Sequence, residues 1–319
     1  MSNIKLLSEE DFIPAMEGEA AQWREHYVKS GDMTATDGTP LRYYKAKAPA
    51  AKGYIVMVHG FCEFWGKYHE VAWYFWQMGY SIFFLEQRGY GYSGGKGSES
   101  DVVVIDSYMT YVEDLKLFMD SVVLTSDASG RRFLFAHSMG GAVAALFMED
   151  HPGYFDEAIL SSPMLMMKTR IFPEPVLTGI KLYGIVSGNL TKSAPGQRRW
   201  DGVNVFETSS TQSKPRYDYQ FSMRCEDVHY QTYGASLSWG IASMRANRRL
   251  LRRAGRVKVP VTIFAAGADH LVDQEGYRIF AKKAAKVRII EFPDSKHEIF
   301  NSTEDNRIRY YEEIEKILI

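Results

Sequence analysis

The sequence of 319 residues has few cysteines and no long hydrophobic run. Its two cysteines, Cys62 and Cys225, are too few for a disulfide framework, and no spacing of cysteine and histidine resembles a zinc site. We therefore expect a reducing compartment, and we expect neither a structural metal nor a cofactor.

A targeting segment and an excess of charge of one sign are also missing. The N-terminus, MSNIKLLSEEDFIPAMEGEA, carries acidic side chains where a signal peptide needs an apolar core, and no run approaches the roughly 20 apolar residues of a membrane span. The formal net charge of -1 gives no global attraction to nucleic acid or to an anionic surface. We expect a cytoplasmic protein that binds no nucleic acid.

Six short apolar runs are typical of buried parallel strands. A β-hairpin is expected before them at 32–46, because Asp37-Gly38 suits a tight turn. Helix-like segments at 68–79, 111–123 and 275–285 separate most of the runs, which lie at residues 53–60, 80–87, 132–138, 156–163, 260–267 and 287–293. This alternation predicts a doubly wound α/β fold with a mostly parallel sheet.

The alternation stops between Ser162 and about Val259, where no clear strand pattern is found. Helical pieces punctuated by proline and glycine fill the interval, at residues 172–188, 214–231 and 235–255. Such a block between two core strands predicts an inserted helical lid, or cap. We therefore divide the chain into a first core part at 1–162, a lid at 163–258 and a second core part at 259–319.

The stretch RRFLFAHSMGGAVAALFMED, residues 131–150, places a serine where a strand pattern gives way to an alanine-rich helical one. A sharp turn there would strain the backbone of Ser138 and needs small residues two positions away on either side, which Ala136 and Gly140 provide. This is the G-x-S-x-G elbow with alanine in first place. Taken alone, the pentapeptide also fits a helix N-cap, but the elbow makes Ser138 our candidate nucleophile.

A serine nucleophile requires an acid and a histidine base, which follow it in the chain in this type of fold. Asp269 follows the strand pattern at 260–267, and His297 lies in the loop after the pattern at 287–293. Each residue alone fits an ordinary loop, but their joint placement at strand ends predicts a triad with Ser138. The competing acids are Asp273, Asp294 and Glu298, and the competing bases are His137 and His270.

An oxyanion hole needs two backbone amides near the nucleophile. A strand pattern ends at His59-Gly60, so the amide of Phe61 can face the serine beside the amide of Met139 at the helix start. Nothing in the sequence marks an activating base for Cys62, and we assign this thiol to the pocket lining. The candidate pocket residues are His59, Gly60, Cys62 and His137.

Gly89, Gly91 and Gly94 match the spacing of a dinucleotide-binding loop. Such a loop should open a helix in the first βαβ unit, with an acidic residue about 20 positions further on. Here the glycines continue into GGKGSESD, a pattern typical of a loop. We interpret the segment as a tight turn beneath the site.

Five motifs in order, VHGFCEFWGKY, EQRGYGYSG, FAHSMGG, GADHLVD and SKHEIF, resemble the lysophospholipase L2 and monoacylglycerol lipase branch of the α/β-hydrolase fold. The likeness runs from the predicted hairpin to the C-terminus. By motif position it implies the nucleophile Ser138, the acid Asp269, the base His297 and the oxyanion amides of Phe61 and Met139. The sequence departs from the family in two places, at Glu86, where the family usually has aspartate, and in the lid stretch at 192–210.

The resemblance implies a serine hydrolase that cleaves an ester of a monoacyl lipid, either a lysophospholipid or a monoacylglycerol, through an acyl-enzyme. On the same triad, a short-chain esterase, an aminopeptidase of the proline iminopeptidase type and a cofactor-free haloperoxidase or perhydrolase are alternatives. An aminopeptidase would place a lid acid near the free amine of its peptide, and the candidates are Glu207, Glu226 and Asp227. A binding protein on a hydrolase scaffold is the alternative outside enzymes, although the intact triad argues against it.

Two stretches of the predicted lid, one apolar and one basic, indicate what its surface contacts. Residues 164–186 are rich in Met, Leu and Ile, which suits an acyl-chain pocket, a lipid-facing surface or packing on the core. Further on, Arg245, Arg249, Arg252 and Arg256 recur at three- and four-residue spacing and should share one helical face. We favour a solvated basic face, and peripheral contact with phospholipid head groups at the inner face of the membrane is the alternative.

Overall fold

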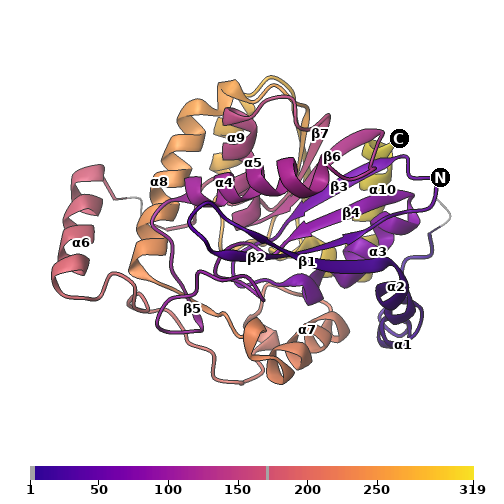
Figure 1. Ribbon diagram of the computed structural model, residues 1–319, viewed down its shortest axis with the longest axis horizontal. Coiled ribbons are helices and arrows are strands. Elements are labelled where there is room, and N and C mark those ends of the chain that lie inside the picture. The colour runs from indigo at the N-terminus through magenta and orange to yellow at the C-terminus, as the bar shows by residue number, and fades with distance from the viewer. Residues whose placement is uncertain (1–3, 170–171) are drawn as a thin grey trace.

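The computed structural model describes residues 4–169 and 172–319. Its main sheet has eight strands in the order β1-β2-β4-β3-β6-β7-β9-β10 (Figure 1). The strands from β4 to β10 in this order pair in parallel, whereas β2 pairs antiparallel with β1 and with β4. The prediction of a mostly parallel α/β sheet is confirmed. The strands are β1 (Val28–Thr34), β2 (Pro40–Ala46), β3 (Gly53–Val58), β4 (Tyr80–Leu85), β6 (Arg131–His137), β7 (Glu157–Ser161), β9 (Val261–Ala266) and β10 (Val287–Phe292).

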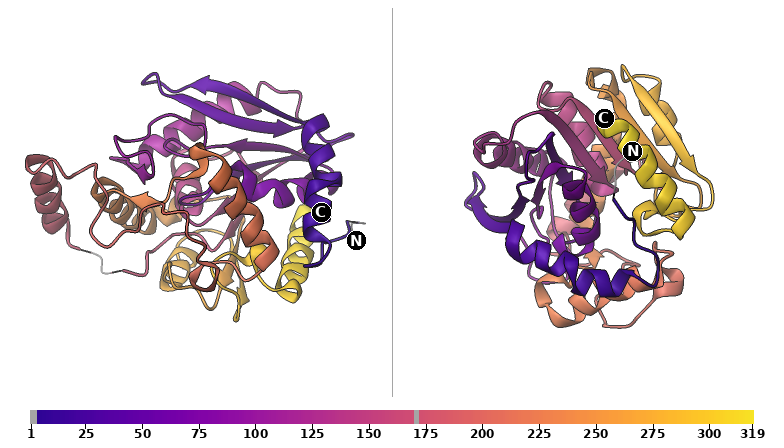
Figure 2. Two further views of the ribbon diagram at one scale, coloured as in Figure 1. Left: turned by 90° about the horizontal axis from the view of Figure 1, so that it is seen from below. Right: turned by 90° about the vertical axis from the view of Figure 1, so that its right-hand side faces the viewer.

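Two apolar cores lie on opposite faces of this sheet. Along β3, Val56 and Val58 belong to one core, while Ile55 and Met57 belong to the other. Helices α4, α5, α8 and α9 contribute to the first core, and α1, α2, α3 and α10 contribute to the second (Figure 2). Covering both faces explains why the strands are continuous apolar runs. The helices are α1 (Phe12–Glu17), α2 (Glu19–Tyr27), α3 (His69–Gln77), α4 (Tyr108–Phe118), α5 (Met139–Asp150), α8 (Leu237–Arg253), α9 (Glu275–Ala281) and α10 (Glu304–Leu318).

The hairpin formed by β1 and β2 has the predicted turn but is longer than predicted. Gly38 takes a φ of +86°, a conformation that glycine adopts without steric cost. The first strand begins at Val28 rather than at Asp32, because Val28 to Gly31 pair with Tyr43 to Ala46.

The interval between β7 and β9 contains α6 (Glu174–Val186), α7 (Lys214–Glu226) and α8. Helix α8 packs against α5, α7 contacts α1, and α6 projects from the body of the molecule (Figures 1 and 2). The expectation of no strand in this interval is wrong in one detail, because β8 (Gly234–Ala235) pairs in parallel with β5 (Val102–Val103). Two residues are too few to leave a periodic pattern in a sequence. Neither α6 nor any other helix of the described residues has both the length and the apolar character to cross a bilayer.

Candidate active site

Ser138 lies in the turn between β6 and α5, with a φ of +51° and a ψ of -118° that a side chain rarely tolerates. Gly140 permits this turn, because a Cβ atom there would lie 2.2 Å from the carbonyl oxygen of Val58. The amide of Ser138 donates to the carbonyl of Ser161 at 3.1 Å, and its carbonyl accepts from the amide of Met164 at 2.7 Å. The neighbouring strand and the chain beyond it therefore hold the strained serine in place.

The structure brings Ser138, Asp269 and His297 together from the turns that follow β6, β9 and β10. His297 Nε2 lies 2.8 Å from Ser138 Oγ, and His297 Nδ1 lies 2.5 Å from Asp269 Oδ2. The other carboxylate oxygen of Asp269 accepts from the amides of Leu271 at 2.7 Å and Val272 at 3.2 Å. The three side chains belong to buried residues, so this chain of contacts is shielded from water.

Burial and hydrogen bonding act on the two ionisable members in opposite ways. Burial disfavours the charged form of Asp269, but the contact with His297 and the two amides outweigh it, and the pKa of Asp269 lies below its ordinary value. For His297, burial is the larger effect and lowers the pKa, although Asp269 opposes it. At neutral pH the site therefore pairs a carboxylate with a neutral imidazole.

The competing acids and bases have other partners or positions. Asp273 accepts from the amide of Glu275 at the start of α9, and Glu298 forms an ion pair with Lys67. Among the described residues, neither acid bonds to His297. His137 is buried with Nδ1 facing Glu63, whereas His270 is exposed.

The amides of Phe61 and Met139 have no hydrogen-bond acceptor among the described residues. Met139 is the first residue of α5, whose N-terminal amides favour negative charge. The ring of Phe61 packs on Trp239 of α8, with ring centroids 4.3 Å apart. The next residue, Cys62, has a φ of +56°, and its carbonyl accepts from the guanidinium of Arg224 in α7. The interval between β7 and β9 thus supports the loop that presents the Phe61 amide.

A buried group of charges lies behind this loop. Lys67 Nζ lies 2.6 Å from Glu63 Oε1 and 2.7 Å from Glu298 Oε1, and the lysine side chain is only 6% exposed. Burial opposes the charge on all three residues, but their mutual attraction outweighs it, so the pKa of each carboxyl is lowered and the pKa of Lys67 is raised. Glu63 also accepts from the amide of Gly60, which fixes the start of the same loop.

Sequence reasoning did not identify Glu63, Lys67 or Arg224. A carboxylate four residues before a lysine was the only local signal for the first two. Arg224 reaches Cys62 across 162 residues of sequence, and such a contact leaves no local pattern.

The four candidate pocket residues are placed differently from one another. Cys62 lines a cavity together with residues that follow Asp269 and His297 in the sequence, and burial raises the pKa of its thiol, which disfavours a thiolate nucleophile. His59, Gly60 and His137 are buried and, like the three triad residues, are not among the residues that line that cavity. Nδ1 of His59 contacts the carbonyl of Gly60 and Nε2 accepts from the amide of Gln87, so both ring nitrogens support the loop rather than a ligand.

The cavity has a volume of about 450 Å³ and reaches from Phe61 and Cys62 to His270 and Leu271, the two residues after Asp269. Most of its remaining wall comes from the interval between β7 and β9. This wall combines aromatic and aliphatic side chains with polar ones: Arg198, Trp200, Val203, Val205, Thr208, Ser209, Ser210, Thr211, Tyr217, Gln220, Phe221, Arg224 and Tyr233.

The glycine-rich segment at 89–94 forms a closed turn rather than a nucleotide-binding loop. The amide of Gly89 donates to the carbonyl of Gly94 at 2.8 Å, and no helix begins at the segment. A Cβ atom on Gly91 would lie 2.2 Å from the carboxylate of Glu86. That carboxylate accepts from the amides of Trp65 and Tyr92, so Glu86 closes the turn.

Comparisons with known proteins agree with this architecture. A family model described as serine aminopeptidase, S33, matches residues 49–304. Lysophospholipase L2 of Escherichia coli K12 is 26% identical over 82% of this chain and 76% of its own length. The monoacylglycerol lipase of Mycolicibacterium smegmatis is 25% identical over 81% of this chain and 85% of its own length. The crystal structure of a monoglyceride lipase variant from Saccharomyces cerevisiae with a substrate analogue covers 91% of this chain and 94% of its own, at a TM-score of 0.70 and 19% identity.

Proposed function

The chain belongs to the serine aminopeptidase S33 family of α/β hydrolases, and from that premise we propose that it cleaves the carboxylic ester of a monoacyl lipid with Ser138 as nucleophile. Its relatives of about 25% identity are named lysophospholipases and monoacylglycerol lipases, which supports an ester hydrolase rather than a binding protein. The choice between these two kinds of monoacyl lipid is part of the test below.

The contact between His297 Nε2 and Ser138 Oγ, at 2.8 Å, carries the proposal. His297 takes the proton of the serine as Oγ attacks the ester carbonyl, and the amides of Phe61 and Met139 hold the oxyanion that forms. Asp269 orients the imidazole and stabilises its charged form. His297 then protonates the leaving alcohol, and it activates the water that releases the acid from Ser138.

The volume and the lining of the cavity are consistent with a substrate that has one acyl chain and a polar head group. Its volume of about 450 Å³ is within the usual range for small-ligand sites. Trp200, Val205 and Phe221 offer apolar surface, while Thr208 and Ser210 line the same cavity with polar side chains. Because the interval between β7 and β9 supplies most of this wall, we assign residues 163–258 as the lid of the site.

The aminopeptidase alternative lacks an acid in the required place. Glu207 and Glu226 are exposed, and Asp227 accepts from Tyr92 and His229. None of the three lines the cavity, and Glu298, which does, is paired with Lys67. Among the described residues, no unpaired carboxylate therefore faces a substrate amine.

Hydrolysis of p-nitrophenyl esters from acetyl to palmitoyl, beside lysophosphatidylcholine and monoacylglycerol, tests the proposal. The wild-type chain should turn over longer esters better and release fatty acid from at least one monoacyl lipid, and Ser138→Ala should abolish both activities. Ser187→Ala, an exposed serine of the lid, is the matched control. Activity confined to short esters would contradict the lipid assignment, and activity that survives in Ser138→Ala would contradict the nucleophile.

A further inference from the structure

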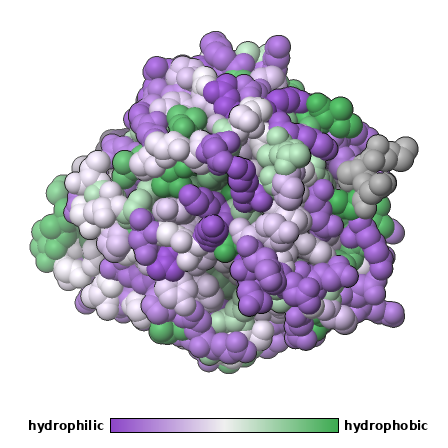
Figure 3. Space-filling view, turned by 45° about the vertical axis from the view of Figure 1, so that its right-hand side comes forward, coloured by the Kyte–Doolittle hydropathy of each residue, from purple (hydrophilic) through white to green (hydrophobic). Residues whose placement is uncertain are grey.

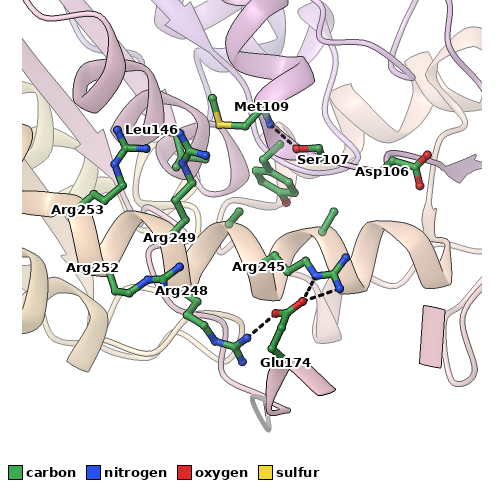
Figure 4. Close-up of a pocket in the computed structure, with 13 residues that line it drawn as sticks. Asp106, Ser107, Met109, Leu146, Glu174, Arg245, Arg248, Arg249, Arg252 and Arg253 are labelled. Atoms are coloured by element: carbon green, nitrogen blue, oxygen red, sulfur yellow. Dashed lines mark hydrogen bonds and ion pairs between the residues drawn. The ribbon is translucent and has the colours of Figure 1, made fainter. Parts of the chain in front are cut away.

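Five arginines of α8 line a second hollow on the outer side of the molecule, with a volume of about 440 Å³ (Figure 4). We call it the arginine groove. Asp106 and Glu174 are the only carboxylates among its described lining residues. Arg245 and Arg248 extend toward Glu174 at the start of α6, as Figure 4 shows. The five arginines are Arg245, Arg248, Arg249, Arg252 and Arg253.

These arginines are only partly neutralised. Arg245 and Arg248 share Glu174, at 2.7 and 2.8 Å, and Arg249 and Arg253 share Asp150. Exposed Arg252 makes no ion pair or hydrogen bond with the described residues. Glu174 thus faces two guanidinium groups and Asp150 faces three, because Arg256 also lies 3.9 Å from Asp150. Asp106 pairs with Lys181 instead, so positive charge remains for an external anion.

The four arginines for which the sequence spacing predicts one helical face take different partners. Arg245 turns to Glu174 while Arg249 turns to Asp150, and Arg256 lies beyond the end of α8 in a short 3-10 turn. Arg245, Arg249 and Arg252 nevertheless line the arginine groove together, as the shared helical face predicts, whereas Arg256 does not line it.

Apolar side chains also line the arginine groove, and others are exposed on α6, which contacts α8. Those that line the groove include Met109, Leu146, Ala242 and Ala246. Helix α6, which begins at Glu174, leaves most of its large apolar side chains in solvent, and Val186 is 89% exposed and Tyr183 69% exposed. The exposed apolar residues of α6 are Val176, Leu182, Tyr183, Ile185 and Val186. The face in Figure 3 is mainly hydrophilic, with a hydrophobic group at the margin on the side where α6 projects in Figure 1.

We infer that the arginine groove and α6 together form a docking surface for a bilayer that contains anionic phospholipid. The guanidinium groups bind head-group phosphates, and the exposed apolar residues of α6 enter the interface beside them. The positive charge of the groove favours an anionic surface as the partner. The solvent-exposed apolar residues of α6 next to these cations favour a lipid surface over nucleic acid. This inference rests on the proposed function, because it brings the lid to the place where monoacyl lipids reside.

Vesicle co-sedimentation of the full chain tests the inference, with phosphatidylcholine vesicles alone and with phosphatidylglycerol added. We expect binding to the anionic vesicles that weakens with added salt, and a loss of about tenfold or more in Arg248→Gln/Arg252→Gln. The matched control is Arg131→Gln/Arg288→Gln, which removes the same charge from a different hollow and should bind as the wild type does. Tyr183→Ser/Val186→Ser should also weaken binding, compared with the exposed pair Leu124→Ser/Ile319→Ser.

Equal binding by the groove variant and its control would overturn the inference. So would equal binding to neutral and anionic vesicles, or binding of inorganic phosphate or RNA without binding of vesicles. Hydrolysis of a dispersed short ester separates this failure from a failure of the proposed function. Wild-type hydrolysis of that ester without vesicle binding would refute docking alone, and vesicle binding without any serine-dependent hydrolysis would refute the proposed function alone.

Discussion

The cavity lined by Phe61 and Cys62 and the arginine groove have nearly equal volumes, about 450 and about 440 Å³, but their charges are balanced differently. In the cavity, Lys67 is buried between Glu63 and Glu298, and Arg224 is held by three main-chain carbonyls. Of the groove's arginines, Arg245 and Arg248 share Glu174 and Arg249 and Arg253 share Asp150, and these guanidinium groups remain partly exposed.

This difference separates two uses of charge. Closed and buried pairs fix the loops that surround the triad, because breaking one leaves an uncompensated charge in the interior. Open and shared pairs contribute little to stability but leave donors for an external anion.

Replacing the nucleophile should separate chemistry from docking completely. Ser138→Ala should lower kcat/KM for any accepted ester by about 10⁴- to 10⁶-fold, because no other group at the site can form the acyl-enzyme. Anionic vesicle binding should stay at the wild-type level in the same variant. A variant that loses both properties while its circular dichroism spectrum is unchanged would show that the two hollows are not independent.

Removing the buried cation should cost far more stability than removing an exposed one. Lys67→Met leaves Glu63 and Glu298 buried without their partner, and we expect a loss of about 3–5 kcal/mol in the free energy of unfolding. Arg252→Gln should change it by less than about 0.5 kcal/mol. Urea unfolding of both variants measures the difference, and similar midpoints would refute the distinction between closed and open charges.

Arg224 should act as a positioning residue for the loop that presents the amide of Phe61. Arg224→Met removes the donor to the carbonyl of Cys62, so the strained loop loses its support, and kcat should fall by about tenfold with a smaller change in KM. Arg198→Gln is the control, because Arg198 lines the same cavity but is half exposed and pairs with Asp201. A change in KM alone would instead assign Arg224 to substrate binding.

The pH profile gives the smallest effect and reports on His297. The base must be neutral to accept the proton of Ser138, and burial lowers the pKa of its imidazole. As pH falls, kcat/KM should therefore stay high through pH 6.5, the ordinary value for histidine, and decline only below it. Titration of released acid at constant pH measures the profile, and a decline centred above pH 6.5 would show that Asp269 outweighs burial.

The parts of the structure that depend on local pattern could be predicted from the sequence. Continuous apolar runs indicated the parallel strands, and the small residues around Ser138 indicated the strained turn at which the serine lies. Asp269 and His297 follow strands, and the carboxyl ends of parallel strands meet at one edge of a sheet. Their proximity is therefore a consequence of topology.

The parts that depend on distant contacts could not be predicted. Lys67 meets Glu298 only after the chain has folded, and Arg224 reaches Cys62 from the interval between β7 and β9, whose path follows no simple periodicity. Helical spacing predicted that Arg245, Arg249 and Arg252 line one groove, but it could not predict that Arg245 pairs with Glu174 and Arg249 with Asp150. Helical spacing places side chains around a helix axis, but tertiary partners decide where their charged ends lie.

Trapping the acyl-enzyme tests whether Ser138 is the nucleophile. Acid quenching during turnover of a long-chain p-nitrophenyl ester, followed by mass spectrometry of the digested protein, should show one acyl group on the peptide that contains Ser138. Ser138→Ala should show no acyl group. Turnover with no adduct on that peptide, or an adduct on Cys62 or another residue that persists in Ser138→Ala, would contradict the account.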